Sequence, residues 1–132
     1  MDIRTHELMD PRFSGEPIEV AEGTARVRLE TAAELRADAT GLVHGGFVFS
    51  LADHAAMLAI NHPNVVLGSA STRFLKPVVV GDALIAGARV DRREGKKIFV
   101  TVEVLRGEEA VMTGEMVCFT PEHHVLGASE AR

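Results

Sequence analysis

The sequence has no tryptophan, no tyrosine and a single cysteine among its 132 residues. One cysteine cannot form a disulfide within the chain. Because Cys118 lies in an apolar run, we expect a small core residue and a reducing, cytoplasmic compartment. The formal net charge is −5, and two aromatic side-chain types that stack on bases are missing. These features predict a protein without a nucleic-acid partner.

Long hydrophobic runs are also missing. No segment approaches the roughly 18 apolar residues of a membrane span, and residues 1–13 carry acids where a signal peptide carries bases, so we expect no membrane partner. Hydrophobic residues make up 46% of the chain, which at this length is enough for one core without disulfides. We predict a single domain over residues 1–132. Its ends are a loosely packed lead-in over 1–17, with a helix-compatible stretch at 5–9, and a flexible tail over 122–132.

The patterning of the chain predicts one helix and several strands. Residues 47–60 run for fourteen positions without glycine or proline and are rich in alanine, which is typical of a helix. The predicted strands, which are apolar-rich or alternating and separated by turn signals, are 24–30, 65–75, 83–90, 98–104 and 110–119. Short turns join antiparallel neighbours, and the lone helix must cover the sheet. The sequence therefore predicts an α+β fold, with an antiparallel sheet of five to six strands wrapped around one long central helix.

Three polar residues interrupt the predicted helix: Ser50, Asp53 and His54. Together with Met57 and Asn61 they are spaced three or four residues apart and fall along one stripe of the helix. This stripe is either the solvent-facing edge of a core helix or the part of the helix that carries a site. The helix pattern alone leaves both interpretations open.

Two glycines precede this helix, in the run His44-Gly45-Gly46. Glycines at a helix start leave backbone amides free at the positive end of the helix dipole, where a carbonyl oxygen that becomes an oxyanion is stabilised. Asp53 follows about two turns later, roughly 10–12 Å along the helix. A carbonyl group between them would meet amides on one side and a carboxylate on the other, which suits acyl chemistry. Glycine pairs before helices also serve packing, so this loop alone does not decide the function.

The segment from His44 to Asp53, followed by Asn61, by Phe74-Leu75-Lys76-Pro77 and by Gly81-Asp82, resembles the hotdog-fold acyl-CoA thioesterases. The resemblance covers residues 41–119 and is to the PaaI-like branch, which is related to phenylacetic-acid-degradation and hydroxybenzoyl-CoA thioesterases. It implies a hotdog fold that hydrolyses an acyl-CoA thioester, with coenzyme A only as part of the substrate and with no cofactor or metal. It also implies a homodimer joined edge to edge through its sheets, with active sites between the subunits, or a homotetramer of such dimers.

The same resemblance implies roles for individual residues. Asp53 matches the helix carboxylate that acts as nucleophile or as general base, Gly45 matches the amide that polarises the thioester carbonyl, and His44 matches a supporting histidine. The implied substrate-binding residues are Gly46, Asn61, Ser71, Thr72, Arg73 and Lys76. Of these, Arg73 and Lys76 would meet the phosphates of coenzyme A.

Two positions depart from the family pattern. Asp38 stands where relatives often carry Asn or Gln, and Met57 stands where some carry Thr or Ser. Asp38 is either a second acid close to Asp53, in which case the pKa of one of the two carboxyls is raised, or an ordinary loop residue.

The sequence also carries features that bear on other functions. Six histidines invite a metal-binding interpretation, but their spacing matches no recognised zinc pattern. A serine hydrolase would need the G-x-S-x-G elbow, which the sequence lacks. A hotdog dehydratase that pairs His44 with Asp53 and a non-catalytic acyl-CoA-binding module stay as alternatives. The acyl group, whether aromatic or of short or medium chain length, stays open.

Overall fold

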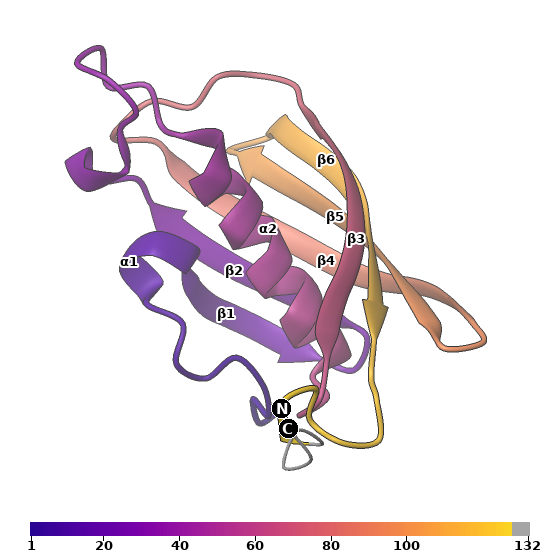
Figure 1. Cartoon of the computed structure of the whole chain (residues 1–132). Helices are drawn as coiled ribbons and strands as arrows, with labels where there is room; N and C mark the ends of the chain where they lie inside the picture. Colours follow the sequence, from indigo (N-terminus) through magenta and orange to yellow (C-terminus); the bar gives the residue numbers. More distant parts are fainter. Residues whose placement is uncertain (128–132) are drawn as a thin grey trace.

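The computed structural model describes residues 1–127, which form one antiparallel sheet around a central helix (Figure 1). In chain order the elements are α1 (Pro11–Ser14), β1 (Glu16–Ala21), β2 (Thr24–Glu30), a 3-10 turn (Ala33–Leu35), α2 (Gly45–Ile60), β3 (Val66–Phe74), β4 (Ala83–Glu94), β5 (Lys97–Arg106) and β6 (Glu109–Phe119). The strands are hydrogen-bonded in the order β1-β2-β4-β5-β6-β3, and each neighbouring pair is antiparallel. The predicted α+β hotdog arrangement is confirmed.

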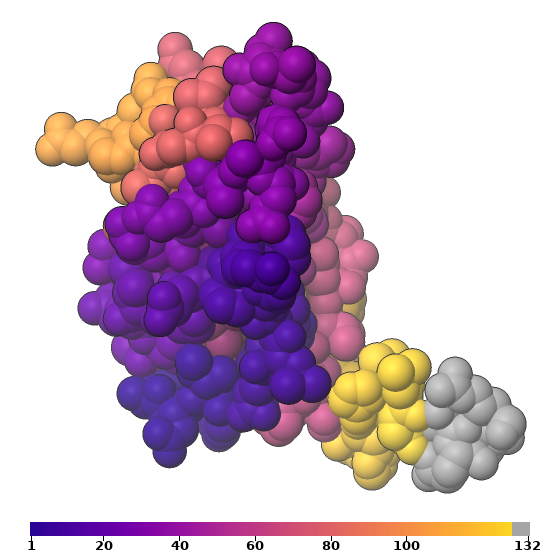
Figure 2. All heavy atoms as spheres, turned by 90° about the vertical axis from the view of Figure 1, so that its left-hand side faces the viewer, coloured from indigo at the N-terminus to yellow at the C-terminus, as the bar shows by residue number. Residues whose placement is uncertain are grey.

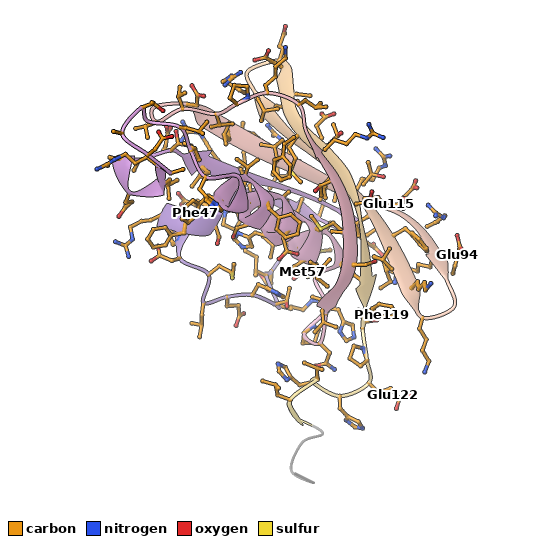
Figure 3. All side chains as sticks on the ribbon, turned by 45° about the horizontal axis from the view of Figure 1, so that its top comes forward. Phe47, Met57, Glu94, Glu115, Phe119 and Glu122 are labelled. Atoms are coloured by element: carbon orange, nitrogen blue, oxygen red, sulfur yellow. The ribbon has the colours of Figure 1, made fainter. Side chains whose placement is uncertain are left out.

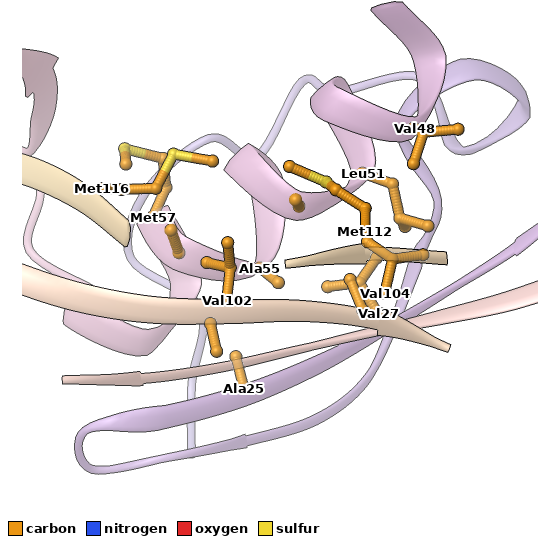
Figure 4. Packing of buried hydrophobic residues seen from close by; sticks show 14 of the residues in the cluster. Ala25, Val27, Val48, Leu51, Ala55, Met57, Val102, Val104, Met112 and Met116 are labelled. Carbon is orange, nitrogen blue, oxygen red and sulfur yellow. The ribbon is translucent and has the colours of Figure 1, made fainter. Parts of the chain in front are cut away.

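The helix α2 is buried because its surface is almost entirely apolar. Nine of its sixteen residues are buried. The small side chains of Ala52, Ala55 and Ala56 are fully buried, and they let the sheet approach the helix closely. Figure 4 shows Leu51 and Ala55 of α2 on the side of the helix that faces the sheet. The long helix predicted over residues 47–60 is therefore the core of the domain, and it begins two residues earlier than predicted.

The sequence predicts no strand at residues 16–21, where the structure has β1. The first two of these residues fall in the predicted lead-in over 1–17. β1 runs along the sheet edge and pairs only with β2. A register shift between Pro17 and Glu19 interrupts the two-residue alternation that identifies a strand in a sequence. Pro17 fits here because an edge strand does not need every backbone amide as a donor.

The lead-in itself is packed against α2, which corrects the expectation that it is loose. Thr5 and Ser14 are buried, and the side-chain amide of Asn61 donates to Asp2 O and accepts from Arg4 N, both at 2.8 Å. The short N-terminal helix lies at Pro11–Ser14 rather than at 5–9, because Asp10 caps it by accepting from Arg12 N and a proline occupies its first position.

The C-terminal segment after β6 projects from the body of the domain (Figure 2). Within it, Pro121 O and Glu122 O both accept from the side-chain amide of Asn64, and residues 122–127 are exposed. Residues 128–132, the rest of the predicted flexible tail, lie outside the described residues. Over the described range 1–127, no helix has both the length and the apolar character needed to cross a membrane.

Candidate active site

The polar stripe of α2 is covered by the N-terminal segment and does not form a solvent-facing edge. Ser50 Oγ lies 2.8 Å from Ser14 Oγ, and His54 Nδ1 lies 2.8 Å from Ser14 O. A carbonyl oxygen can only accept, so His54 donates through Nδ1. Burial lowers the pKa of His54, which keeps the imidazole neutral at physiological pH. Ser50 and His54 therefore hold the N-terminal segment on the helix.

Asn61 has the same kind of role at the other end of α2. It adopts the left-handed conformation, with φ of 51°, and its backbone amide donates to Met57 O. Both polar atoms of its side chain bind the lead-in backbone, and the residue is almost fully buried. The structure thus places Asn61 away from the start of α2 and gives its side chain a structural role.

Asp53 is the polar residue of this helix that the fold leaves unsatisfied. Its Oδ1 is buried and has no hydrogen-bond partner within residues 1–127. Burial raises the pKa of Asp53 from 3.8 to about 6. An unpaired buried carboxylate oxygen destabilises a fold, so its presence calls for a functional explanation.

Asp53 also acts on the single cysteine. Burial, and after it the charge of Asp53, raise the pKa of Cys118 to about 12. The thiol is fully buried on β6 and stays protonated, so it is not a nucleophile. The prediction that Cys118 is a core residue is confirmed.

At the start of α2, His44 caps the helix with its side chain. Its Nδ1 accepts from Gly46 N at 2.8 Å, so the amide of Gly46 is occupied. A Cβ atom on Gly46 would lie 2.8 Å from this nitrogen, closer than packing permits. The cap thus explains why residue 46 is a glycine, and it removes the Gly46 amide from the set of free donors.

The amide of Gly45, in contrast, has no acceptor among the described residues. A Cβ atom at this position would meet Phe74 Cε1 at 3.6 Å, an ordinary contact, so packing does not demand a glycine here. The backbone N–H of Gly45 therefore points from the positive end of a sixteen-residue helix with no side chain to obstruct an incoming oxygen. It lies eight residues before Asp53 on the same helix, or about 12 Å of helix rise.

Three large apolar residues of β3 and α2, namely Phe74, Phe47 and Met57, lie in different environments. Phe74 is 53% exposed and lies beside Gly45. Phe47 stacks on Phe13 of α1, with ring centroids 5.9 Å apart, while Met57 is buried within the core (Figures 3 and 4). Phe74 is thus the one of these three side chains that borders the free amide.

The strand β3 divides the other predicted binding residues between two faces of the sheet. Phe74 pairs with the fully buried Met112 and faces the helix, so Thr72, two residues earlier, faces it too. Ser71 and Arg73 point to the opposite face. Their cross-strand neighbours are Glu115 and Thr113, and Figure 3 shows Glu115 on the side of the sheet away from α2.

Lys76 follows the end of β3, is exposed and forms no ion pair within residues 1–127; the same is true of Arg73. Within this chain the structure therefore brings His44, Gly45 and Asp53 onto one helix, with Thr72 on the facing side of the sheet. It does not bring Ser71 or Arg73 to that face.

The structure also shows the surroundings of Asp38 and Met57, the two residues that depart from the family pattern. Asp38 is exposed, and its Oδ1 accepts from the hydroxyl and then from the backbone amide of Thr40, which lower the pKa of that carboxyl. Burial is the cause of the raised pKa of Asp53, so Asp38 acts as a loop residue. Met57 occupies a core position, where a hydroxyl group would be desolvated.

Sequence reasoning missed a cluster that holds the loop between β3 and β4, formed by Thr31, Asp82 and Arg106. These residues come from three separate segments, and no local spacing signals their contact.

As for a metal centre, none of the described residues form a group of three or more His, Cys, Asp and Glu side chains able to hold an ion.

Comparison with known proteins identifies the family. Residues 40–113 match the profile described as the thioesterase superfamily. The chain is 52% identical to the uncharacterized protein PH1136 of Pyrococcus horikoshii, whose crystal structure superposes with a TM-score of 0.93 over 96% of this chain and 97% of that one. The PaaI protein from the phenylacetic acid degradation operon of E. coli is 27% identical, with a TM-score of 0.72 over 79% of this chain and 81% of that one.

Among curated proteins, the chain is 56% identical over 115 residues to methylthioribose-1-phosphate isomerase of Aquifex aeolicus, a match that covers 87% of this chain and 25% of that protein. It is also 34% identical over 87 residues to the transcription factor FapR of Caldanaerobacter subterraneus, covering 66% of this chain and 44% of that protein. The chain thus spans about a quarter of the first relative and less than half of the second.

Proposed function

This chain belongs to the thioesterase superfamily, and we propose that it hydrolyses the thioester of an acyl-coenzyme A to the free acid and coenzyme A. One observation carries the proposal. A buried carboxylate without a partner and a backbone amide without an acceptor lie on the same helix. Among the side chains of residues 1–127, Asp53 Oδ1 is the one buried nitrogen or oxygen atom without a hydrogen-bond partner, and the Gly45 amide has no acceptor there, so we assign these two groups to a substrate.

Gly45 and Asp53 of one helix lie about 12 Å apart along its axis, too far to act on one carbonyl group. The proposed reaction therefore pairs them across the proposed dimer: the thioester carbonyl oxygen accepts a hydrogen bond from Gly45 N–H of one subunit, and the acting Asp53 belongs to the other. Asp53 either takes a proton from water as the water attacks the carbonyl carbon, or attacks the carbon itself and is then released by water. The negative charge that develops on the carbonyl oxygen is stabilised by the amide and by the helix dipole. The carbon–sulfur bond breaks when the resulting tetrahedral adduct collapses; where Asp53 is the nucleophile, this step comes before water releases the acyl group from it. Coenzyme A leaves as the thiol, and its proton comes in the end from the water. Water is the only co-reactant, so the proposed reaction needs no cofactor.

The raised pKa of Asp53 suits this role. A base with a pKa of about 6 is mostly ionised at neutral pH and is stronger than an ordinary carboxylate. His44 serves the reaction indirectly: its cap occupies the neighbouring amide of Gly46 and orders the first turn of the helix.

We further propose that the chain acts as a homodimer or homotetramer built through β3. This nine-residue strand lies at a sheet edge, with β6 on one side and no strand of residues 1–127 on the other. An edge of this length exposes backbone donors and acceptors that a second copy of β3 would pair. Light scattering tests this, because twice or four times the chain mass is expected and a monomer would contradict it.

The test of the function is release of free thiol from a panel of aromatic, short-chain and medium-chain acyl-CoAs. Wild type is expected to release thiol from at least one class, and Asp53→Asn should lower kcat by about 100-fold or more, the range for loss of a general base. Asp38→Asn is the matched control, since Asp38 is also a carboxylate near α2 but is exposed and bound to its own loop. Equal activity of wild type and Asp53→Asn, with the fold intact by circular dichroism, would refute the mechanism.

A second candidate is a non-catalytic acyl-CoA-binding module. The similarity to a transcription factor, FapR, favours it. Calorimetric binding of an acyl-CoA without thiol release would support this candidate against hydrolysis. Isomerase activity is not proposed, because the match to the Aquifex isomerase covers only 25% of that protein.

A further inference from the structure

The loop of residues 75–82, which joins β3 to β4, lies against the residues that lead into α2. Val43 N donates to Val78 O at 2.8 Å, and Val80 N donates to Gly41 O at 2.9 Å. These two hydrogen bonds hold residues 41–43 in a short bridge to the loop. Ala37 N also donates to Leu42 O and His44 N to Leu35 O, so residues 35–37 hold the other side of this segment. Because His44 and Gly45 follow directly, the 75–82 loop is one of the two segments that fix the position of the Gly45 amide.

The loop is in turn fastened by Arg106, at the end of β5. Arg106 Nη1 donates to Pro77 O and to Asp82 Oδ2, both at 2.9 Å, while Nη2 pairs with Glu109. Asp82 Oδ2 also accepts from Val79 N at 3.0 Å. The guanidinium therefore joins both ends of the loop to the rigid sheet. Arg106 is 28% exposed and Asp82 19% exposed at the side chain, so this ion pair is less screened than a fully exposed pair.

Thr31, the residue that follows β2, supports the same loop. Its hydroxyl lies 3.1 Å from Val79 O and 2.7 Å from Asp82 O, and its carbonyl accepts from Gly81 N at 2.9 Å. Thr31 is buried, so these contacts are sheltered from water. Arg106 at the end of β5 and Thr31 after the end of β2 thus fasten the loop at two separate places.

We infer that Arg106 is a positioning residue for the proposed hydrolysis: through the 75–82 loop it sets the place of the Gly45 amide that receives the thioester oxygen. The inference rests on the proposed function, since the amide matters only if an oxyanion forms there. Arg106 itself reaches the loop and not the substrate.

The effect of losing this contact follows from hydrogen-bond geometry. An oxyanion donor works at 2.7–3.1 Å from the oxygen, and a misplacement of about 1 Å costs as much as about 100-fold in rate. Loss of Arg106 frees the loop at Pro77 and Asp82, while the contacts of Thr31 remain. We therefore expect Arg106→Ala to lower kcat about tenfold, with KM changed less than twofold, because the amide bond strengthens mainly in the transition state.

The experiment combines kinetics with amide hydrogen exchange in the full chain. Arg106→Ala should speed exchange in peptides that contain Val43 and Val80, whose amides bond across the bridge. Arg106→Lys should restore part of the activity, because one ammonium cannot reproduce the guanidinium contacts to Pro77, Asp82 and Glu109. Arg92→Ala is the matched control. Arg92, like Arg106, pairs with carboxylates, three against two, but it lies on β4 against Phe99 and forms no hydrogen bond to the loop.

Thr31→Val is the second variant, in case Arg106→Ala fails to fold. It keeps the side-chain shape while removing the two hydroxyl contacts, and it should also accelerate exchange and lower kcat. Hydrogen exchange that is unchanged at Val43 and Val80 in both variants would overturn the inference about Arg106, even if the wild type is active. The inference would also be overturned if Arg92→Ala changed the exchange and kcat as much as Arg106→Ala does. If the wild type releases thiol from no acyl-CoA, the proposed function fails. The positioning role of Arg106 in hydrolysis then fails with it, whereas the exchange data still show whether Arg106 holds the loop.

Discussion

Replacing Asp53 by asparagine should stabilise the fold at neutral pH while it removes the proposed activity. In the folded chain, burial holds the proton of Asp53 up to about pH 6, whereas an unperturbed carboxyl releases its proton near 3.8. Between these values the folded state binds more protons than the unfolded state. The free energy of unfolding therefore falls as the pH rises through this window, and the loss is complete above about pH 6.

The size of the effect follows from the two pKa values. They differ by about two pH units, which corresponds to about 3 kcal/mol at about 1.4 kcal/mol per unit. Asparagine has nearly the same shape and no charge to desolvate. Asp53→Asn should therefore raise the free energy of unfolding by up to about 3 kcal/mol at pH 7.5, and by about 1 kcal/mol at pH 4.5, where the folded carboxyl is already protonated.

The assay is urea denaturation of wild type and Asp53→Asn at both pH values, at one fixed protein concentration because association also shifts stability. The other titratable groups are common to both proteins, so the difference between the two curves isolates Asp53. A variant that is less stable than wild type at pH 7.5, or a difference that is the same at both pH values, would refute the claim that Asp53 is a desolvated, ionised carboxylate.

Further predictions concern the two ends of α2. Gly45→Ala should lower kcat at least tenfold with little loss of stability, because its Cβ meets only an ordinary contact within the chain but would obstruct the approach to the amide. Gly46→Ala should instead destabilise the fold by about 1 kcal/mol, because the new Cβ displaces the His44 cap. Kinetics and thermal melts of the two variants, measured in parallel, check this contrast, and the same phenotype for both would contradict it. Asn61→Ala should accelerate hydrogen exchange over residues 2–5, because both side-chain contacts to that segment are lost; unchanged exchange would show that the segment is held by other contacts.

Much of the fold could be predicted because its elements have strong local signals. The helix follows from a long alanine-rich run without glycine or proline, and the strands β2 to β6 follow from apolar-rich or alternating segments separated by turn signals. The strand β1 could not, since the shift between Pro17 and Glu19 breaks its alternation. Its place in the sheet depends on pairing with β2, which local pattern does not encode.

The candidate site shows the same division between local and long-range information. The motif His44-Gly45-Gly46 and the spacing to Asp53 could be read from the sequence. The sequence could not show that the Gly46 amide is hydrogen-bonded while the Gly45 amide is free, because this depends on the orientation of the His44 imidazole. For a similar reason, the sequence does not decide whether the polar stripe of α2 faces solvent or carries a site. Ser14, which covers Ser50 and His54, lies 36 and 40 residues away in sequence, so the isolation of Asp53 emerges only once the chain is folded.

The central claim is that Asp53, acting as a buried base or nucleophile, is the group whose ionisation permits thioester hydrolysis. The most direct test is the pH dependence of kcat/KM for thiol release, measured with wild type and Asp53→Asn on the best acyl-CoA. Wild-type kcat/KM is expected to rise tenfold per pH unit below an apparent pKa of about 6 and to reach a plateau above it, whereas the residual activity of Asp53→Asn is expected to lack this step. A wild-type profile without a step near 6, or the same step in Asp53→Asn, would contradict the claim.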